Sequence, residues 1–260
     1  MTLRRIRRAV ALVFVLSLCI LRYWLMRLRG PMTLERRALW LQGAARSILK
    51  TLGIEFQVEG QPPTRGLVVA NHLSYLDILI ISAVMPCFFV AKMEIGGWPF
   101  FGKAARSGGT IFVDRSSLSS AMTVAEQISE RLKLPVPVLL FPEGTSTDGA
   151  QLLRFHSRLI DPATTAGASI TATAIRYLVD DGDVEERELC WYGDEPFLTH
   201  LWKVLGVARF SGHLWFGEPK IYSHRREAAD KTHAEITAWR EATAPATQSE
   251  MVTQTANAVN

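Results

Sequence analysis

The chain has 260 residues, of which 48% are hydrophobic and 21% charged, so it can bury a sizeable core and does not have the composition of a disordered chain. Its net charge of +4 is uneven: residues 1–53 hold eleven Lys/Arg and one acid, which is +10, so the remainder carries −6. This distribution argues against a basic nucleic-acid-binding fold. Three widely spaced cysteines, Cys19, Cys87 and Cys190, argue against a disulfide framework or a zinc site and predict ordinary buried thiols.

The first segment of the chain predicts a membrane-associated helix. Four arginines between residues 4 and 8 precede an uncharged run of 13 residues, Ala9 to Leu21, and more arginines follow. As a helix this run is roughly 20 Å long, short of a bilayer core of about 30 Å. The Leu-Arg-Tyr-Trp that follows lacks the small residues of a signal-peptide cleavage site. We expect a helix that dips into one leaflet, or a hairpin with a second helix over Leu34–Leu52; a single-span anchor and a soluble amphipathic helix are the alternatives.

After residue 53, short apolar runs alternate with helical patterns. Strands are expected at Leu67–Ala70, Phe88–Ala91, Thr110–Val113, Pro137–Phe141, Ile170–Tyr177, Leu189–Tyr192 and Val207–Phe216. Helices are expected at Leu73–Met85, Ser119–Leu132 and Arg226–Glu241, with a linker at Gly60–Gly66 and a loop at Gly96–Gly102. The alternation predicts an α/β domain over residues 53–242, with a central, mostly parallel sheet flanked by helices. Residues 1–52 form the membrane-associated helical segment of this scheme, and residues 243–260 a disordered tail.

The first expected strand is followed directly by Asn71-His72-Leu73-Ser74-Tyr75-Leu76-Asp77. His72 can act as a general base if a carboxylate orients it, and Asp77 is five residues away. Within an ideal helix these two residues are about 140° apart, so they meet only if His72 lies before the helix begins. Taken alone, a histidine at a strand end is more often a structural residue than a catalytic one.

Two further strand ends also carry chemical groups. Gly109–Arg115 ends in a guanidinium that can bind a phosphate through two hydrogen bonds. Phe141–Ser146 contains Glu143 and Gly144, and a glycine there allows the backbone to approach a ligand closely. Because parallel strands place their ligands at their carboxyl ends, we expect these groups and His72 to share one edge of the sheet.

These three stretches resemble the motifs of a known family. Asn71–Asp77 matches NHxxxxD, Gly109–Arg115 matches GxxFxxR and Phe141–Ser146 matches FPEGT(S), in the order and spacing of the glycerolipid acyltransferases, the 1-acylglycerol-3-phosphate O-acyltransferase group. The resemblance covers about residues 53–216 and implies the fold of that family. One position departs from it: Ala172 stands where the family often has a proline in a fourth strand. This departure bears on one wall of the pocket and therefore on the identity of the acceptor.

The resemblance implies a role for each matching residue. His72 is the base that deprotonates the acceptor hydroxyl, Asp77 orients His72, and Arg115 binds the phosphate or another anionic head group of the acceptor. The other implied substrate-binding residues are Asn71, Glu143, Gly144 and Thr145.

The implied protein is a membrane-bound O-acyltransferase of phospholipid biosynthesis. It moves a fatty acyl chain from acyl-CoA or an acyl carrier protein to the free hydroxyl of a lyso-lipid, with 1-acylglycerol 3-phosphate as the favoured acceptor and phosphatidic acid as the product. No metal, other cofactor or nucleic acid is called for, and the catalytic domain is expected at the cytoplasmic face of the cell membrane. The alternatives are another acceptor, such as lyso-ornithine lipid or a lysophospholipid, or a non-catalytic lipid-binding protein on the same fold. A lipid hydrolase is disfavoured because Gly-x-Ser-x-Gly is absent.

Overall fold

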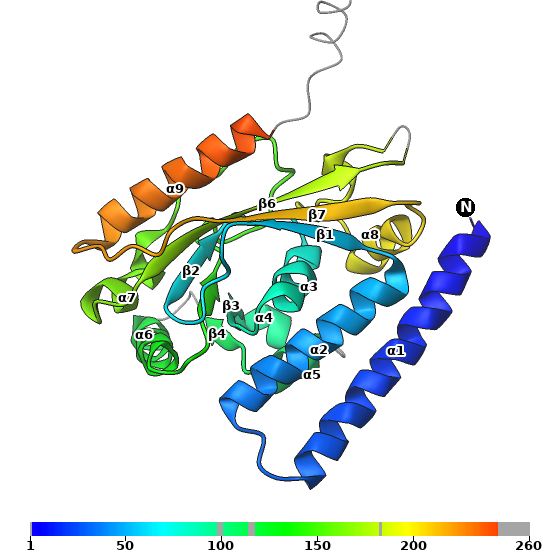
Figure 1. Ribbon diagram of the computed structural model, residues 1–260, viewed down its shortest axis with the longest axis horizontal. Helices are drawn as coiled ribbons and strands as arrows, with labels where there is room; N and C mark the ends of the chain where they lie inside the picture. The colour runs from blue at the N-terminus through cyan, green and yellow to red at the C-terminus, as the bar shows by residue number, and fades with distance from the viewer. Residues whose placement is uncertain (1, 98–100, 114–117, 182–183, 244–260) are drawn as a thin grey trace, which may run out of the picture.

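A computed structural model describes residues 2–97, 101–113, 118–181 and 184–243, and within them seven strands form one sheet (Figure 1). The sheet order is β1-β7-β6-β2-β5-β3-β4, and all neighbouring strands are parallel except β6 and β7. The strands are β1 (Glu55–Glu59), β2 (Leu67–Ala70), β3 (Phe88–Lys92), β4 (Ile111–Val113), β5 (Val138–Leu140), β6 (Ile170–Val179) and β7 (Phe210–Phe216). The expected α/β class with a mostly parallel sheet is confirmed.

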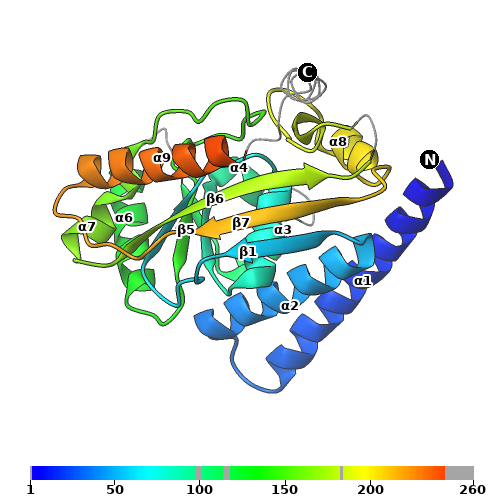
Figure 2. The same cartoon turned by 45° about the horizontal axis from the view of Figure 1, so that its top comes forward.

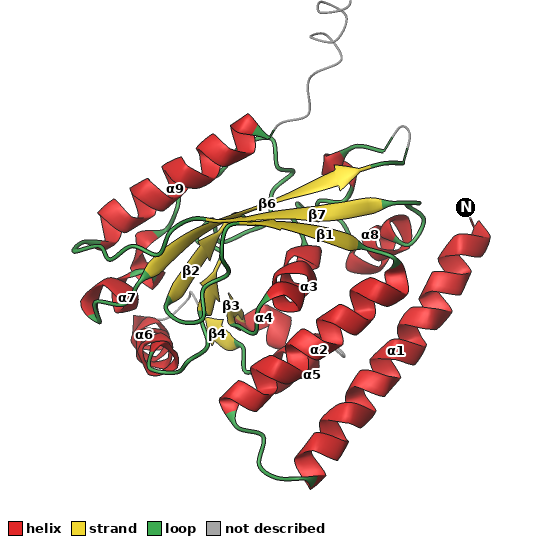
Figure 3. Ribbon diagram, in the orientation of Figure 1, coloured by secondary structure: helices red, strands yellow, loops and turns green. Residues whose placement is uncertain are grey.

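Helices cover both faces of the sheet (Figure 3). One core cluster joins α2 and α3 to one face, and a second cluster joins α6, α7 and α9 to the other. The α-helices are α1 (Thr2–Leu28), α2 (Leu34–Leu52), α3 (Tyr75–Val84), α4 (Met93–Gly96), α5 (Phe101–Gly108), α6 (Leu118–Leu132), α7 (Asp161–Thr165), α8 (Phe197–Val204) and α9 (Arg225–Ala242). Two single turns of 3-10 helix are η1 (Ser157–Leu159) and η2 (Glu186–Glu188).

The N-terminal segment forms the expected helical hairpin, in which α1 and α2 lie side by side (Figures 1 and 2). The indole N–H of Trp40 on α2 donates to the backbone carbonyl of Cys19 on α1, at 3.0 Å. Of the most apolar 18-residue stretch of α1, only 11% is buried, and the helix is long and apolar enough to cross a membrane. By contrast, α2 is part of the core, where it buries Trp40, Ala44, Ala45, Ile48, Leu49 and Leu52 in the same cluster as the sheet.

Several arginines of this segment bind helix carboxyl ends within the protein. Arg4 donates to the carbonyl of Gly206, and Arg8 to the carbonyls of residues 205, 207 and 208, all directly after α8. Arg36 donates to Met26 near the end of α1, and Arg46 donates to Ala83 near the end of α3. The last carbonyls of a helix have no partner inside it, and a cation there is favourable. Part of the +10 charge therefore holds helices together instead of facing an anionic membrane.

Two expectations about local structure differ from the structure, and one strand was not predicted. The strand expected at Leu189–Tyr192 is absent, because this stretch follows η2 and turns across the carboxyl edge of the sheet. The two ends of the loop expected at Gly96–Gly102 belong to helices, since α4 ends at Gly96 and α5 begins at Phe101, and residues 98–100 lie outside the described residues. The linker expected at Gly60–Gly66 holds no helix or strand, as predicted. The strand β1 just before it was not predicted, because its five residues are all exposed and show no apolar pattern. All three cysteines are free and buried, as expected.

Candidate active site

The carboxyl ends of β2, β5 and β6 meet at one edge of the sheet. β2 lies between the other two and is parallel to both, so the segments that follow β2 and β5 leave the sheet in the same direction. β6 continues past the last β2 residue, Ala70, which pairs with Thr173. As a result, the His72 motif after β2 lies between the Glu143 motif after β5 and the last residues of β6.

His72 and Asp77 form a hydrogen-bonded pair. The helix α3 begins only at Tyr75, so His72 lies before it, and His72 Nδ1 is 2.8 Å from Asp77 Oδ2. Since the carboxylate can only accept, Nδ1 carries the hydrogen and Nε2 keeps its lone pair. The imidazole is 20% exposed and the Asp77 side chain is fully buried. The expected contact between the two side chains is present, and their roles as general base and orienting carboxylate stay a prediction.

The buried carboxylate of Asp77 is surrounded by donors. Its Oδ2 also accepts the backbone N–H groups of Leu73 at 2.7 Å and Ser74 at 3.1 Å, because Asp77 reaches back over the first turn of α3. Its Oδ1 accepts the hydroxyl of Tyr177 from β6. These donors give both oxygens of the buried carboxylate hydrogen-bond partners, which offsets the cost of taking it out of water.

The ring of His72 is further fixed by stacking on Phe141, which ends β5. The ring centroids are 4.0 Å apart and the planes differ by 14°. The backbone carbonyl of His72 accepts the N–H of Thr147 at 3.0 Å. The imidazole is therefore held on one face by an aromatic side chain and through its own backbone by the segment after β5.

Two other expected site residues are engaged with backbone groups. Glu143 is 4% exposed, and its carboxylate accepts the N–H of His72 at 2.8 Å and that of Leu153 at 2.9 Å. Burial raises the pKa of Glu143 above its usual value, against the opposing effect of these two hydrogen bonds. The amide of Asn71, fully buried, exchanges two hydrogen bonds with the backbone of Ile175 in β6. Glu143 and Asn71 thus join the His72 motif to its two neighbours in the sheet.

The remaining expected residues are placed differently. Gly144 adopts a φ of 74°, a left-handed conformation that favours glycine, and Thr145 beside it is exposed. Arg115 lies outside the residues that the structure describes. Ala172 belongs to the core cluster on the α6 and α9 side, and its carbonyl accepts the N–H of Gly217 at 2.9 Å. Its side chain therefore packs in the core and does not line the space beside His72.

The segment between β6 and β7 adds a wall that the sequence did not predict. The N–H of Trp191 donates to the carbonyl of Leu73 at 2.8 Å, and the hydroxyl of Ser146 donates to the carbonyl of Trp191. Tyr75 of the His72 motif makes edge-to-face contacts with Trp191 and Phe197, at centroid distances of 6.0 and 4.9 Å. Tyr177 was also missed as a site residue, although a tyrosine in a buried strand needs a partner for its hydroxyl.

The contacts of Glu143 lead to a prediction that separates a backbone role from a substrate role. Glu143→Gln places an amide N–H₂ against one of two backbone N–H groups, so one charge-assisted hydrogen bond is lost at a cost of about 2 kcal/mol in unfolding free energy. We expect lower stability and a lower kcat with an unchanged acceptor KM, measured by denaturant unfolding and steady-state kinetics. A higher acceptor KM with unchanged stability contradicts this prediction and indicates that Glu143 binds the acceptor lipid.

Comparisons with known proteins identify relatives of this chain. A family model described as Acyltransferase matches residues 54–176. The 1-acyl-sn-glycerol-3-phosphate acyltransferase of Neisseria meningitidis is 35% identical over 207 residues, which cover 75% of this chain and 79% of that protein. The lyso-ornithine lipid O-acyltransferases of Rhodobacter capsulatus and Pseudomonas aeruginosa are 39% and 36% identical, over 61% and 65% of this chain. The chain spans 58% and 64% of the length of these two relatives, which is less than two thirds of each.

A solved structure supports the fold. The crystal structure of the 1-acyl-sn-glycerophosphate acyltransferase of Thermotoga maritima is similar with a TM-score of 0.66, covering 94% of this chain and all of that one at 19% identity. The identity is low, so this likeness concerns the fold alone. The family follows from the match to the Neisseria protein, which extends over more than two thirds of both chains. The chain belongs to the acyltransferase family that contains the 1-acylglycerol-3-phosphate and lyso-ornithine lipid O-acyltransferases.

Proposed function

We propose that the protein transfers a fatty acyl group from a thioester to the hydroxyl of a lyso-lipid. The observation that carries this proposal is the His72–Asp77 pair, in which Nδ1 is bound by the carboxylate and Nε2 is left to accept a proton. Nε2 takes the proton of the acceptor hydroxyl as its oxygen attacks the thioester carbonyl. The tetrahedral intermediate then expels the thiolate, which receives the proton from His72. Asp77 stabilises the imidazolium between these two steps.

The favoured acceptor is 1-acylglycerol 3-phosphate, with phosphatidic acid as the product. The support is the Neisseria enzyme named for that substrate, which this chain matches over 79% of its length. Arg115, in the position of the GxxFxxR arginine, is proposed to bind the phosphate. Gly144 and Thr145 follow Glu143 directly and are proposed to lie against the acceptor.

Lyso-ornithine lipid is the second candidate acceptor. The relatives named for it have higher identity, 39% and 36%, although over less of their length. Its head group is an amino acid and lacks a phosphate ester, so the two acceptors differ in the charge that the site must bind.

We propose that α1 holds the protein on the cytoplasmic face of the cell membrane without crossing it. Exposed apolar side chains line α1, among them Val10, Phe14, Leu21 and Trp24. A spanning α1 has to leave the contacts of Arg4 and Arg8 with the chain after α8, and its contact with α2 through Trp40. A helix lying in the interface keeps them and brings the site close to its lipid substrates.

Acyl transfer by the purified full-length protein in detergent tests the proposal. Labelled acyl-CoA and acyl carrier protein thioester are each offered with 1-acylglycerol 3-phosphate, lyso-ornithine lipid and a zwitterionic lysophospholipid. We expect labelled phosphatidic acid from wild type and none from His72→Ala. If ornithine lipid is the only labelled product, lyso-ornithine lipid is the acceptor in place of 1-acylglycerol 3-phosphate. Thioester hydrolysis without any labelled lipid, or lipid binding without turnover, overturns the proposal.

A further inference from the structure

A third side chain, that of Tyr177, binds the Asp77 carboxylate at the oxygen that His72 does not contact. Tyr177 lies in β6, one hundred residues along the chain from Asp77, and is 2% exposed. Its hydroxyl donates to Asp77 Oδ1, whereas His72 and the backbone N–H groups of the motif all bind Oδ2. The two carboxylate oxygens therefore have different hydrogen-bond donors, and Tyr177 is the donor to Oδ1.

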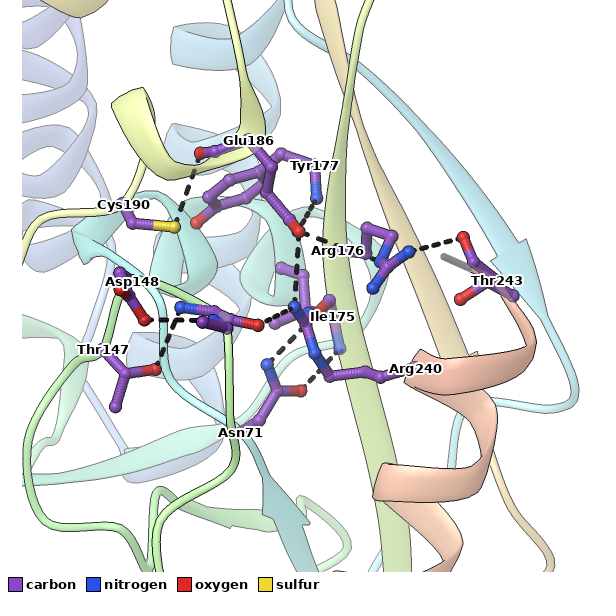
Figure 4. A network of polar contacts seen from close by, with 12 residues as sticks. Asn71, Thr147, Asp148, Ile175, Arg176, Tyr177, Glu186, Cys190, Arg240 and Thr243 are labelled. Carbon is purple, nitrogen blue, oxygen red and sulfur yellow. Dashed lines mark hydrogen bonds and ion pairs between the residues drawn. The ribbon is translucent and has the colours of Figure 1, made fainter. Parts of the chain in front are cut away.

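The position of Tyr177 is fixed independently of the pair. Its backbone N–H donates to Glu186 Oε1 at 2.8 Å, and its ring makes an edge contact with Phe210, at 6.2 Å between centroids. Figure 4 shows how Arg240 of α9 reaches the same strand, donating to the carbonyl of Ile175 and lying 3.3 Å from Glu186. Because the backbone and the ring of Tyr177 have partners of their own, its hydroxyl is held beside Asp77 by more than their mutual hydrogen bond.

We propose that Tyr177 is a positioning residue for acyl transfer: its hydroxyl fixes the plane of the Asp77 carboxylate and shares the negative charge that faces His72. The inference rests on the proposed function, since it gives His72 the role of base. A hydrogen bond at Oδ1 draws negative charge away from Oδ2, which faces the imidazole. It also resists rotation of the carboxylate, so the Nδ1–H of His72 keeps its acceptor.

The hydroxyl remains a donor over the working pH range. Burial raises the pKa of Tyr177 well above its usual value, and the charge of Asp77 raises it further. The other charged or titratable groups near the array come from the segments after β5 and β6 and from α9. Among the described residues they are Glu143, Asp148, Glu186, Cys190 and Arg240.

Tyr177→Phe removes the hydroxyl and keeps the ring. The carboxylate then concentrates its charge on the side of His72, stabilises the imidazolium, and raises the pKa of His72 by about one pH unit. His72 acts as a base only when neutral, so the acid limb of the pH profile moves to higher pH. We expect kcat to fall roughly 10-fold near neutral pH, with the acceptor KM unchanged.

The test measures the pKa of His72 without any substrate. Imidazole resonances of the full-length protein in detergent are titrated by NMR, and His72→Ala identifies the His72 signal. Tyr177→Phe is compared with Tyr222→Phe, a control at a tyrosine that is buried in the cluster on the other face of the sheet. We expect the His72 pKa to rise only in Tyr177→Phe. A His72 pKa that is unchanged or lower in folded Tyr177→Phe overturns the inference.

A second variant keeps the test informative if Tyr177→Phe folds poorly. Site-specific 3-fluorotyrosine at position 177 is a stronger donor of nearly the same size, and we expect it to lower the His72 pKa. The same pKa as wild type contradicts the inference. Neither titration depends on turnover. If the wild-type protein fails to acylate lyso-lipids, the proposed function is wrong, and the titrations still test the contact of Tyr177 with Asp77.

Discussion

Replacing His72 with alanine is expected to lower acyl transfer by about 10²–10⁴-fold, the usual contribution of a general base. The reason is the free Nε2 of an imidazole whose Nδ1 is bound to buried Asp77. The fold should survive, because the contact of this residue with Glu143 is made by its backbone N–H, which alanine keeps. The loss of stacking on Phe141 should be the main structural cost.

The measurement is single-turnover transfer to a labelled lyso-lipid, with circular dichroism and thermal unfolding to verify folding. His224→Ala is the matched control, since His224 is exposed and lies just before α9. We expect the control to keep wild-type turnover. Wild-type turnover by folded His72→Ala removes His72 from the role of base.

The sequence predicted the central buried strands and the long helices well, and the short elements and the exposed strand β1 poorly. β2 was predicted at its observed bounds, because a buried central strand is an uninterrupted apolar run. β1 escaped notice because all its residues are exposed and its pairing with β7 alone makes it a strand. The domain boundaries at residues 52 and 242 stay predictions, although the burial of α2 in the core joins residues 34–52 to the sheet.

For the candidate site, the sequence predicted the residues within each motif but not the contacts between distant segments. The motifs named His72 and Asp77, and the strand-end argument placed Glu143 beside them. The long-range contacts could not be foreseen, because Tyr177 and Trp191 reach the motif only through the register of β6 and the path of the chain after it. No local pattern records that register. In the structure, the side chains of Asn71 and Glu143 form hydrogen bonds with backbone groups, which the motif match did not predict.

The second large effect is expected when exposed apolar side chains of α1 are replaced, because we propose that they attach the protein to membranes. Phe14 and Leu21 lie two turns apart on α1 and are 66% and 53% exposed. Burial of each side chain in lipid contributes about 2 kcal/mol, so replacing both with glutamate should weaken membrane partitioning about a thousandfold or more. High salt should fail to extract the wild type, because apolar burial depends little on ionic strength.

Flotation of full-length protein with vesicles of mixed zwitterionic and anionic lipids measures this effect. Met122→Glu is the control, since Met122 is 70% exposed but lies on α6, away from the helical hairpin (Figure 1). Point variants are preferred to truncation, because deleting residues 1–52 also removes the buried side chains of α2 and should cause aggregation. If the Phe14→Glu/Leu21→Glu protein still floats fully with the vesicles, or high salt alone releases the wild type, α1 is not the apolar anchor. The arginines that α1 leaves exposed then become the first residues to test for an electrostatic attachment.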